Sequence, residues 1–145
     1  MANKTIVVKR VVKAPIEKVW KAWTVASQMR EWFSPESLTT PEVTADIRVG
    51  GEQMIHMRGS HHAGGSEQDF INTGVYKDID PMKKLVFTWQ WQNDPVVSEV
   101  SVELKKVSDT QTEVILIHIF PNAKAVGMHP QGWESTFNKL ERFFK

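Results

Sequence analysis

The chain opens on a strand pattern that changes to a helix pattern at a proline. Residues 5–13, TIVVKRVVK, are rich in β-branched residues and alternate enough to be typical of a strand. Pro15 is expected at the first position of a helix, because its fixed φ suits that position and holds Ala14 extended. An apolar stripe with helical spacing follows, made of Ile16, Val19, Trp20 and Trp23. The pattern predicts a short amphipathic helix whose two tryptophans face a sheet.

A second short helix is predicted before residue 35. Ser27 is the candidate N-cap of this helix, and Pro35 ends it. Its apolar residues are Met29, Trp32 and Phe33. Helices this short are marginal by themselves, so both are expected to depend on a large packed face.

Residues 42–120 carry the period-two pattern of strands. The clearest case alternates Leu85, Phe87, Trp89 and Trp91 with Val86, Thr88, Gln90 and Gln92. Gly74 is expected to mark a β-bulge. Five turn signals divide the region into six strands. These turns are Gly50-Gly51, the loop 59–68, Asp80-Pro81, Asn93-Asp94-Pro95 and Ser108-Asp109. Six consecutive strands favour a meander of antiparallel pairs.

The last segment, GWESTFNKLERFF at residues 132–144, is helical again. Its apolar stripe consists of Trp133, Phe137, Leu140 and Phe144. The predicted order is one strand, two short helices, six strands and one long helix, all in a single α+β domain over residues 1–145. An antiparallel sheet with one long amphipathic helix must bury the helix stripe against one sheet face.

Composition excludes several classes of protein. Eighteen basic and 17 acidic residues are interspersed and give a net charge of +1, so no nucleic-acid partner is expected. No apolar run approaches 18 residues and no signal segment opens the chain, so neither membrane insertion nor secretion is expected. With no cysteine, disulfide and thiolate chemistry are excluded, and a cytoplasmic location is expected. The unusual feature is the count of six Trp and seven Phe beside one Tyr.

Four segments resemble the family of activator-of-heat-shock-protein-ATPase homologues (AHSA-like) in the START/SRPBCC superfamily, which has the helix-grip or Bet v-like fold. They are VKRVVKAPIEKVWKAWTVASQMREWFSP at 8–35, DIRVGG at 46–51, GVYKDIDPMKKLVFTW at 74–89 and GWESTFNKLERFF. The resemblance implies a curved seven-stranded antiparallel sheet wrapped around the C-terminal helix. It also implies, in many members, an internal cavity for an apolar or amphipathic ligand. Superfamily members include lipid and hormone carriers, cyclases and co-chaperone modules, so it does not imply one activity.

The family pattern places His118 and its apolar neighbours on the interior face of the last strand. The rings then either fill a core or line a ligand cavity between sheet and helix, and both interpretations stay open. The residues predicted to bind a ligand are Trp23, Trp32, Phe33, Tyr76, Phe87, Trp89, Trp91, His118, Phe120, Trp133 and Phe137.

Three polar features invite a functional interpretation. His118 is either a buried histidine with a hydrogen-bond partner or a polar anchor for a ligand. Asp46 and Arg48 are expected to pin the Gly-Gly turn. His61 and His62, with the acidic and histidine residues His56, Glu67 and Asp69, suggest a metal ion, but adjacent residues of a loop rarely converge on one ion. We therefore expect no metal site and no cofactor.

The leading hypothesis is non-covalent binding of a small apolar or amphipathic ligand. No catalytic signature is visible, so a cyclase- or hydrolase-like enzyme using cavity polar groups is the less favoured alternative. Another alternative is a protein that interacts with a heat-shock chaperone and activates its ATPase. If His118 points inward, the opposite face exposes Ile115, Ile117 and Ile119, a possible homodimer or partner surface.

Overall fold

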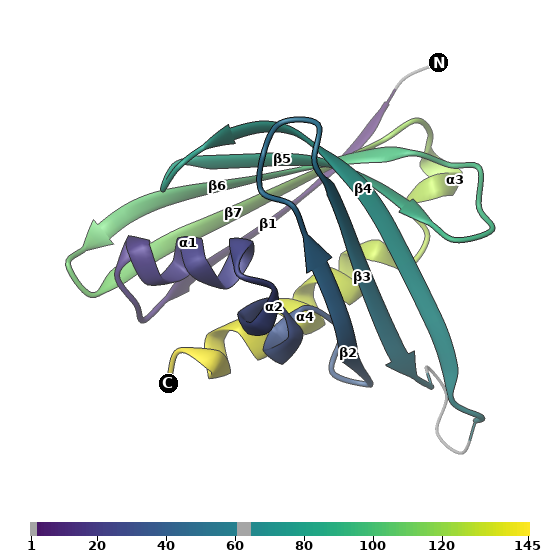
Figure 1. Ribbon diagram of the computed structural model, residues 1–145, viewed down its shortest axis with the longest axis horizontal. Helices are drawn as coiled ribbons and strands as arrows, with labels where there is room; N and C mark the ends of the chain where they lie inside the picture. Colours follow the sequence, from purple (N-terminus) through teal and green to yellow (C-terminus); the bar gives the residue numbers. More distant parts are fainter. Residues whose placement is uncertain (1–2, 61–64) are drawn as a thin grey trace.

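The computed structural model describes residues 3–60 and 65–145. One seven-stranded antiparallel sheet, in the order β1-β7-β6-β5-β4-β3-β2, curls around the C-terminal helix (Figure 1). The elements are β1 (Lys4–Val12), α1 (Ile16–Thr24), α2 (Ala26–Trp32), β2 (Leu38–Ala45), β3 (Glu52–Gly59), β4 (Gln68–Asp80), β5 (Lys84–Trp91), β6 (Ser98–Ser108), β7 (Gln111–Phe120), α3 (Ala123–Val126) and α4 (His129–Phe143). This arrangement confirms the predicted helix-grip fold class.

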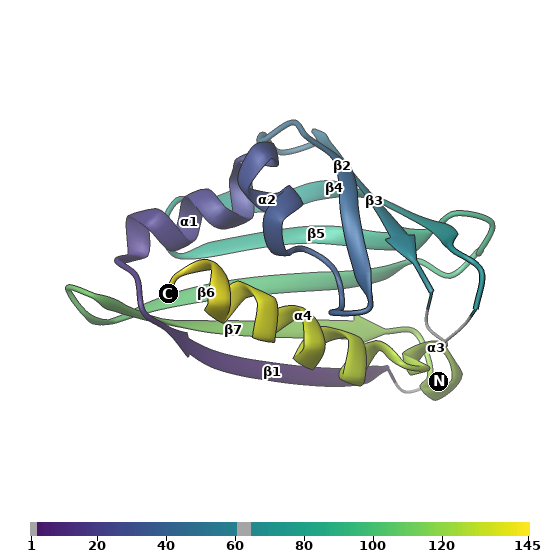
Figure 2. The ribbon, with the colours of Figure 1, turned by 90° about the horizontal axis from the view of Figure 1, so that it is seen from below.

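The topology follows from the order of the elements. Strands β2 to β7 form a meander in which each strand pairs with the next, as predicted. Strand β1 instead pairs with β7, because α1 and α2 carry the chain across the concave face to the far edge of the sheet. Figure 2 shows α4 lying along this concave face beside α1 and α2. The core therefore sits between one curved sheet and three helices.

Helix α4 is held on the sheet by its apolar stripe and by ion pairs at its edge. Trp133, Phe137 and Leu140 are buried, as the stripe predicted. Arg10 on β1 reaches across to α4, where its guanidinium contacts Glu134 at 2.8 Å and Glu141 at 3.0 Å. Burial of apolar rings supplies most of the attachment, and the shared arginine fixes the position of the helix over β1.

Two details of the helix starts differ from the prediction. Pro15 is the N-cap of α1 rather than its first residue, and its extended backbone lets its carbonyl accept from the N–H groups of Lys18 and Val19. Ser27 does not cap α2, which begins at Ala26 with Val25 as N-cap. Val25 ends α1 and starts α2 at once, so no position is left for a capping serine.

Gly74 does not form the predicted bulge, because the register shift of the β4–β5 pair lies between Tyr76 and Asp78. Glycine is required here instead because the backbone of the neighbouring strand passes close to it. A Cβ at Gly74 would lie 1.9 Å from the carbonyl oxygen of Thr88 on the neighbouring strand. Only glycine fits there without moving the backbone.

The outer face of the sheet also differs from the prediction of three exposed isoleucines. Ile115 is buried, with 8% of its surface exposed, while Ile117 and Ile119 are partly buried. Ile115 pairs with Lys9 on one side and Glu103 on the other, and the aliphatic parts of such side chains cover apolar neighbours. The exposed apolar residues of this region are Val7 and Val11 of β1.

Two glycines predict opposite effects of the same substitution. We expect Gly74→Ala to lower the free energy of unfolding by about 1–3 kcal/mol, because the new methyl group collides with backbone. We expect Gly132→Ala in α4 to raise it by about 1 kcal/mol, because the nearest atom to its new Cβ, Pro35 Cγ, is 3.9 Å away. Urea denaturation of both variants measures the two changes. A loss of stability in Gly132→Ala, or none in Gly74→Ala, would contradict this packing.

Candidate functional site

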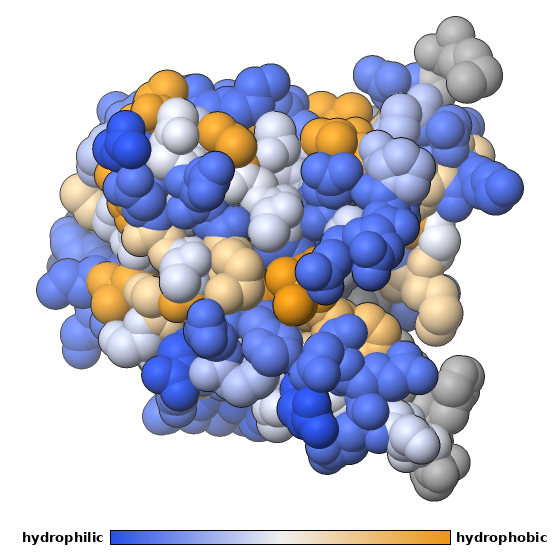
Figure 3. All heavy atoms as spheres, turned by 45° about the vertical axis from the view of Figure 1, so that its right-hand side comes forward, coloured by the Kyte–Doolittle hydropathy of each residue, from blue (hydrophilic) through white to orange (hydrophobic). Residues whose placement is uncertain are grey.

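A pocket of about 310 Å³ opens between the concave face of the sheet and the first half of α4. Its walls come from the segment that follows α2 and the first residue of β2, from β3, β4 and β5, and from the start of α4. The lining residues are Phe33, Pro35, Leu38, Met57, Phe70, Trp89, Trp91, Met128, His129, Gly132, Trp133 and Thr136. Figure 3 shows that polar and charged residues cover most of the face in that view, with smaller apolar areas between them. The lining of the pocket, in contrast, is almost entirely apolar and aromatic.

The predicted binding residues separate into three groups. Four of them, Phe33, Trp89, Trp91 and Trp133, line the pocket. Phe120 lines a smaller hollow on the other side of Trp89, Trp91 and His129. The remaining predicted residues are buried around the pocket without lining it, and they are Trp23, Trp32, Tyr76, Phe87, His118 and Phe137.

His129 is a pocket-lining residue that the sequence analysis missed. Its Nε2 accepts hydrogen bonds from the indole N–H of Trp89 at 3.2 Å and from that of Trp91 at 3.1 Å. Its Nδ1 lies 2.9 Å from the carbonyl oxygen of Val126 and donates to it. The ring is therefore neutral, and burial lowers the pKa of His129. His129 lies one helical turn before Trp133, so extending the apolar stripe backwards would have found it.

His118 holds a third indole in the same way. The indole N–H of Trp133 donates to His118 Nδ1 at 3.0 Å, so the proton of the neutral ring sits on Nε2. Nε2 then donates to Ser98 Oγ at 2.7 Å, and Ser98 donates to the carbonyl oxygen of Trp89 at 3.3 Å. His118 is fully buried, and burial, with a smaller contribution from His129, lowers its pKa to about 3. Because His118 donates to Ser98, it is not placed to remove a proton from that hydroxyl.

The polar groups of the pocket wall are thus already engaged inside the protein. Three indoles donate to two imidazoles, and Thr136 donates to the carbonyl oxygen of Gly132 at 2.8 Å. The rings also contact one another, with Trp133 and Trp89 centroids 5.2 Å apart. Such a wall is rigid and offers a ligand mainly apolar surface.

The other polar candidates take structural roles. Arg48 Nε donates to Asp46 Oδ2 at 2.8 Å, which confirms their pairing at the Gly-Gly turn. His56 Nε2 lies 2.8 Å from Asp69 Oδ1 on the neighbouring strand. His61 and His62 lie outside the described residues. Within residues 3–60 and 65–145, no group of three or more His, Asp or Glu side chains is arranged to hold a metal ion. In the same part of the chain, no helix is long and apolar enough to cross a membrane.

The buried histidines predict how stability depends on pH. The pKa of His118 is about 3 in the folded protein and near 6.5 in the unfolded chain, so the unfolded chain binds more protons between these values. The stabilising contribution is complete above pH 6.5 and is lost as pH falls toward 3. We expect the free energy of unfolding to drop with a slope approaching about 1.4 kcal/mol per pH unit for this group, with His129 adding in the same direction.

Urea denaturation at several pH values between 5 and 7 tests this expectation above the range where most carboxylates titrate. His118→Gln removes the titrating group and should flatten the dependence. An identical slope in the variant and in the wild type would contradict the assignment.

Comparisons with known proteins agree with the fold. The model of the family "Activator of Hsp90 ATPase homolog 1-like protein" matches residues 13–145. No curated protein matches the chain. The solved structure of protein CV1439 from Chromobacterium violaceum has a TM-score of 0.81 at 23% identity, over 97% of this chain and 96% of that one. The AHSA1 (SPO3351) protein from Silicibacter pomeroyi has a TM-score of 0.81 at 21% identity, over 96% of each chain.

Protein Ms6760 from Mycobacterium smegmatis is also similar, with a TM-score of 0.83 at 16% identity, over 100% of this chain and 96% of that one. Identities this low show the fold alone, whereas the family model, which matches residues 13–145, shows the family. Three of the four resembling segments lie wholly inside the matched residues, and the first, at 8–35, overlaps them from residue 13. The chain belongs to the Activator of Hsp90 ATPase homolog 1-like family, within the START/SRPBCC helix-grip superfamily.

Proposed function

We propose that this protein binds a small apolar or amphipathic molecule in the pocket between its sheet and α4. The observation that carries the proposal is that the pocket remains open although large rings surround it. Protein interiors are normally packed so that few voids exceed one water molecule, and this pocket of about 310 Å³ lies at the lower end of ligand-site volumes. Because the wall is apolar, a ligand that buries its own apolar surface against it gains binding free energy.

The fixed orientation of the rings supports the proposal. Trp89 and Trp91 are each held by a hydrogen bond to the partly buried imidazole of His129, and Trp133 by one to the buried imidazole of His118. A wall that is already ordered loses little side-chain entropy when a ligand enters, so more of the desolvation free energy appears as affinity. Long flexible side chains that would have to be displaced are few, with Met57 and Met128 the main examples.

Gly132 offers a way to block the pocket without disturbing the fold. It lies on the face of α4 that lines the pocket, where a Cβ meets no atom closer than 3.9 Å. We expect wild-type protein, titrated with fatty acids, sterols, flavonoids and small aromatic molecules, to show saturable amide shifts near Trp89 and Trp133. Gly132→Leu should abolish those shifts, because the longer side chain occupies the pocket. Leucine also favours a helix over glycine, so the variant should remain folded.

Gly132→Ala is the matched control, since one methyl group fills little of the pocket and should leave binding in place. If no compound shifts the wild-type spectrum, or if Gly132→Leu binds as well as wild type, the pocket is not the binding site.

The family description gives a second candidate function, activation of a heat-shock chaperone ATPase. The outer face of the sheet supports it, because Val7 and Val11 of β1 are 51% and 45% exposed beside the partly buried Ile117. Exposed apolar groups on a sheet face are typical of protein contact sites. A second copy of this chain is the other partner that such a face would fit.

The chaperone hypothesis predicts that excess protein raises the ATPase rate of a heat-shock chaperone of the 90-kDa class, and that Val7→Glu reduces the effect. Sedimentation at tens of micromolar tests the alternative, a homodimer. If the wild-type protein is a dimer through this face, Val7→Glu and Ile117→Glu should each convert it to a monomer. An unchanged ATPase rate together with monomers throughout would remove the outer face as a contact surface.

A further inference from the structure

One side chain beside the pocket has no hydrogen-bond partner among the residues that the structure describes. Asn72 of β4 is fully buried, and neither its Oδ1 nor its Nδ2 is paired. Nε2 of Gln53, a residue 1% exposed, is unpaired as well, while its Oε1 accepts from the Tyr76 hydroxyl at 2.8 Å. The other buried unpaired atom of the described side chains, Trp23 Nε1, lies among the rings of Trp32, Phe33 and Phe137.

The register of the sheet places Asn72 directly behind residues that line the pocket, although Asn72 is not itself a lining residue. Asn72 pairs with Ile55 on β3 and with Trp91 on β5, so its side chain points to the same concave face as theirs. Phe70, two residues earlier on β4, points to that face too. The pocket-lining residues that flank Asn72 directly or diagonally on this face are Met57, Phe70, Trp89 and Trp91.

Gln53 lies on the same face, diagonally across from Asn72, because it pairs with Gly74. Gly74 has no side chain, so nothing on β4 stands between the two amides along this face. Together they present three unpaired polar groups, which are two NH₂ groups that can donate and one carbonyl oxygen that can accept. Buried polar groups in proteins are nearly always paired, so this concentration beside an open pocket calls for a partner that enters it.

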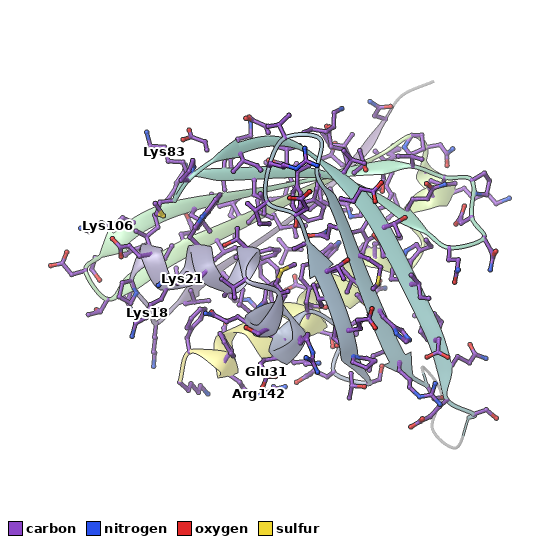
Figure 4. The ribbon with its side chains drawn as sticks, in the orientation of Figure 1. Lys18, Lys21, Glu31, Lys83, Lys106 and Arg142 are labelled. Atoms are coloured by element: carbon purple, nitrogen blue, oxygen red, sulfur yellow. The ribbon has the colours of Figure 1, made fainter. Side chains whose placement is uncertain are left out.

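The charge of the surroundings restricts the partner. None of the described residues that line the pocket carries a positive charge, since His129 is held neutral by its hydrogen bonds. The lysines labelled in Figure 4, Lys18, Lys21, Lys83 and Lys106, lie at the end of the molecule away from α3 and the start of α4. An ionised carboxylate would enter this pocket without a counter-charge, whereas a neutral polar group would not incur that cost.

We propose that Asn72, assisted by Gln53, is the polar anchor that selects ligands ending in a neutral carbonyl group next to an N–H or O–H, a carboxamide being the simplest case. The ligand carbonyl accepts from the side-chain amides, and its N–H donates to Asn72 Oδ1. This inference rests on the proposed function, because it assigns the ligand class of the same pocket. The apolar part of the ligand lies against Trp89, Trp91 and Phe70, and the polar end is buried deepest.

The test compares three probes of one shape, which are naphthalene-2-carboxamide, naphthalene-2-carboxylate and 2-methylnaphthalene. With ¹⁵N-labelled wild-type protein at pH 7, the carboxamide should bind about tenfold or more tightly than either of the others, since two added hydrogen bonds are worth about that factor. The side-chain NH₂ signals of Asn72 should shift on titration with the carboxamide. Asn72→Leu, which has nearly the same shape, should bind 2-methylnaphthalene at least as well as wild type and lose the preference for the carboxamide.

Thr73→Val is the matched control, because Thr73 is exposed on the opposite face of the same strand. It should retain the preference. Suppose that 2-methylnaphthalene binds the wild-type protein and that Gly132→Leu abolishes this binding. If the carboxamide then binds no more tightly than the other probes, or keeps its advantage in Asn72→Leu, the anchor is refuted while the binding function stands. If none of the probes shifts a pocket signal, the binding function fails and the anchor with it. Should Asn72→Leu not fold, the wild-type affinity ratio and the Asn72 NH₂ signals still decide.

Discussion

The structure depends on how Trp133 attaches α4 to the rest of the fold. Its indole N–H donates to His118 on β7, and its ring lies 5.2 Å from that of Trp89 on β5 and 5.8 Å from that of Phe33 after α2. One side chain therefore joins the helix, two strands and the end of a short helix. The pocket opens on the side of Trp133 that faces the start of α4, so the same attachment that closes the core also defines one wall of the candidate site.

Using histidine as the acceptor for buried indoles has consequences for both stability and function. Tryptophan N–H groups can only donate, and a neutral imidazole offers one acceptor and one donor. His118 donates in turn to Ser98, and His129 donates to the Val126 carbonyl, so two rings satisfy three indoles, one hydroxyl and one carbonyl. Because this arrangement works only with neutral rings, it ties the order of the pocket wall to pH.

Much of the fold was predictable because periodic patterns encode it locally. The alternation in residues 85–92 placed Phe87 and Trp89 on the concave face, and the stripe of residues 133–140 gave the buried face of α4. The site was less predictable, because it depends on distances between elements. Met57, Phe70 and Pro35 look like ordinary core residues in the sequence and line the pocket only because β3, β4 and the segment after α2 meet over the first turn of α4.

The exceptions to local prediction fall where two elements share a residue or approach closely. Val25 is both the C-cap of α1 and the N-cap of α2, so Ser27 does not cap a helix. Glycine is required at residue 74 by the nearby backbone of Thr88 rather than by a bulge. Neither constraint has a periodic signal, since each arises from a partner outside the local segment. The outer face followed the same rule, because charged neighbours on adjacent strands cover Ile115.

A pocket lined only by rings would give affinity without orientation, because apolar contact is not directional. The indoles of the pocket wall, Trp89, Trp91 and Trp133, are each paired with an imidazole, and the unpaired amides of Asn72 and Gln53 contrast with them. An apolar residue of the same size in place of Asn72 would fit the alternation of β4 and avoid a polar group buried without a partner. That the sequence carries an amide at this position makes sense if the group is completed by a ligand. Selectivity then comes from a directional pair beside the pocket, while the aromatic wall supplies most of the affinity.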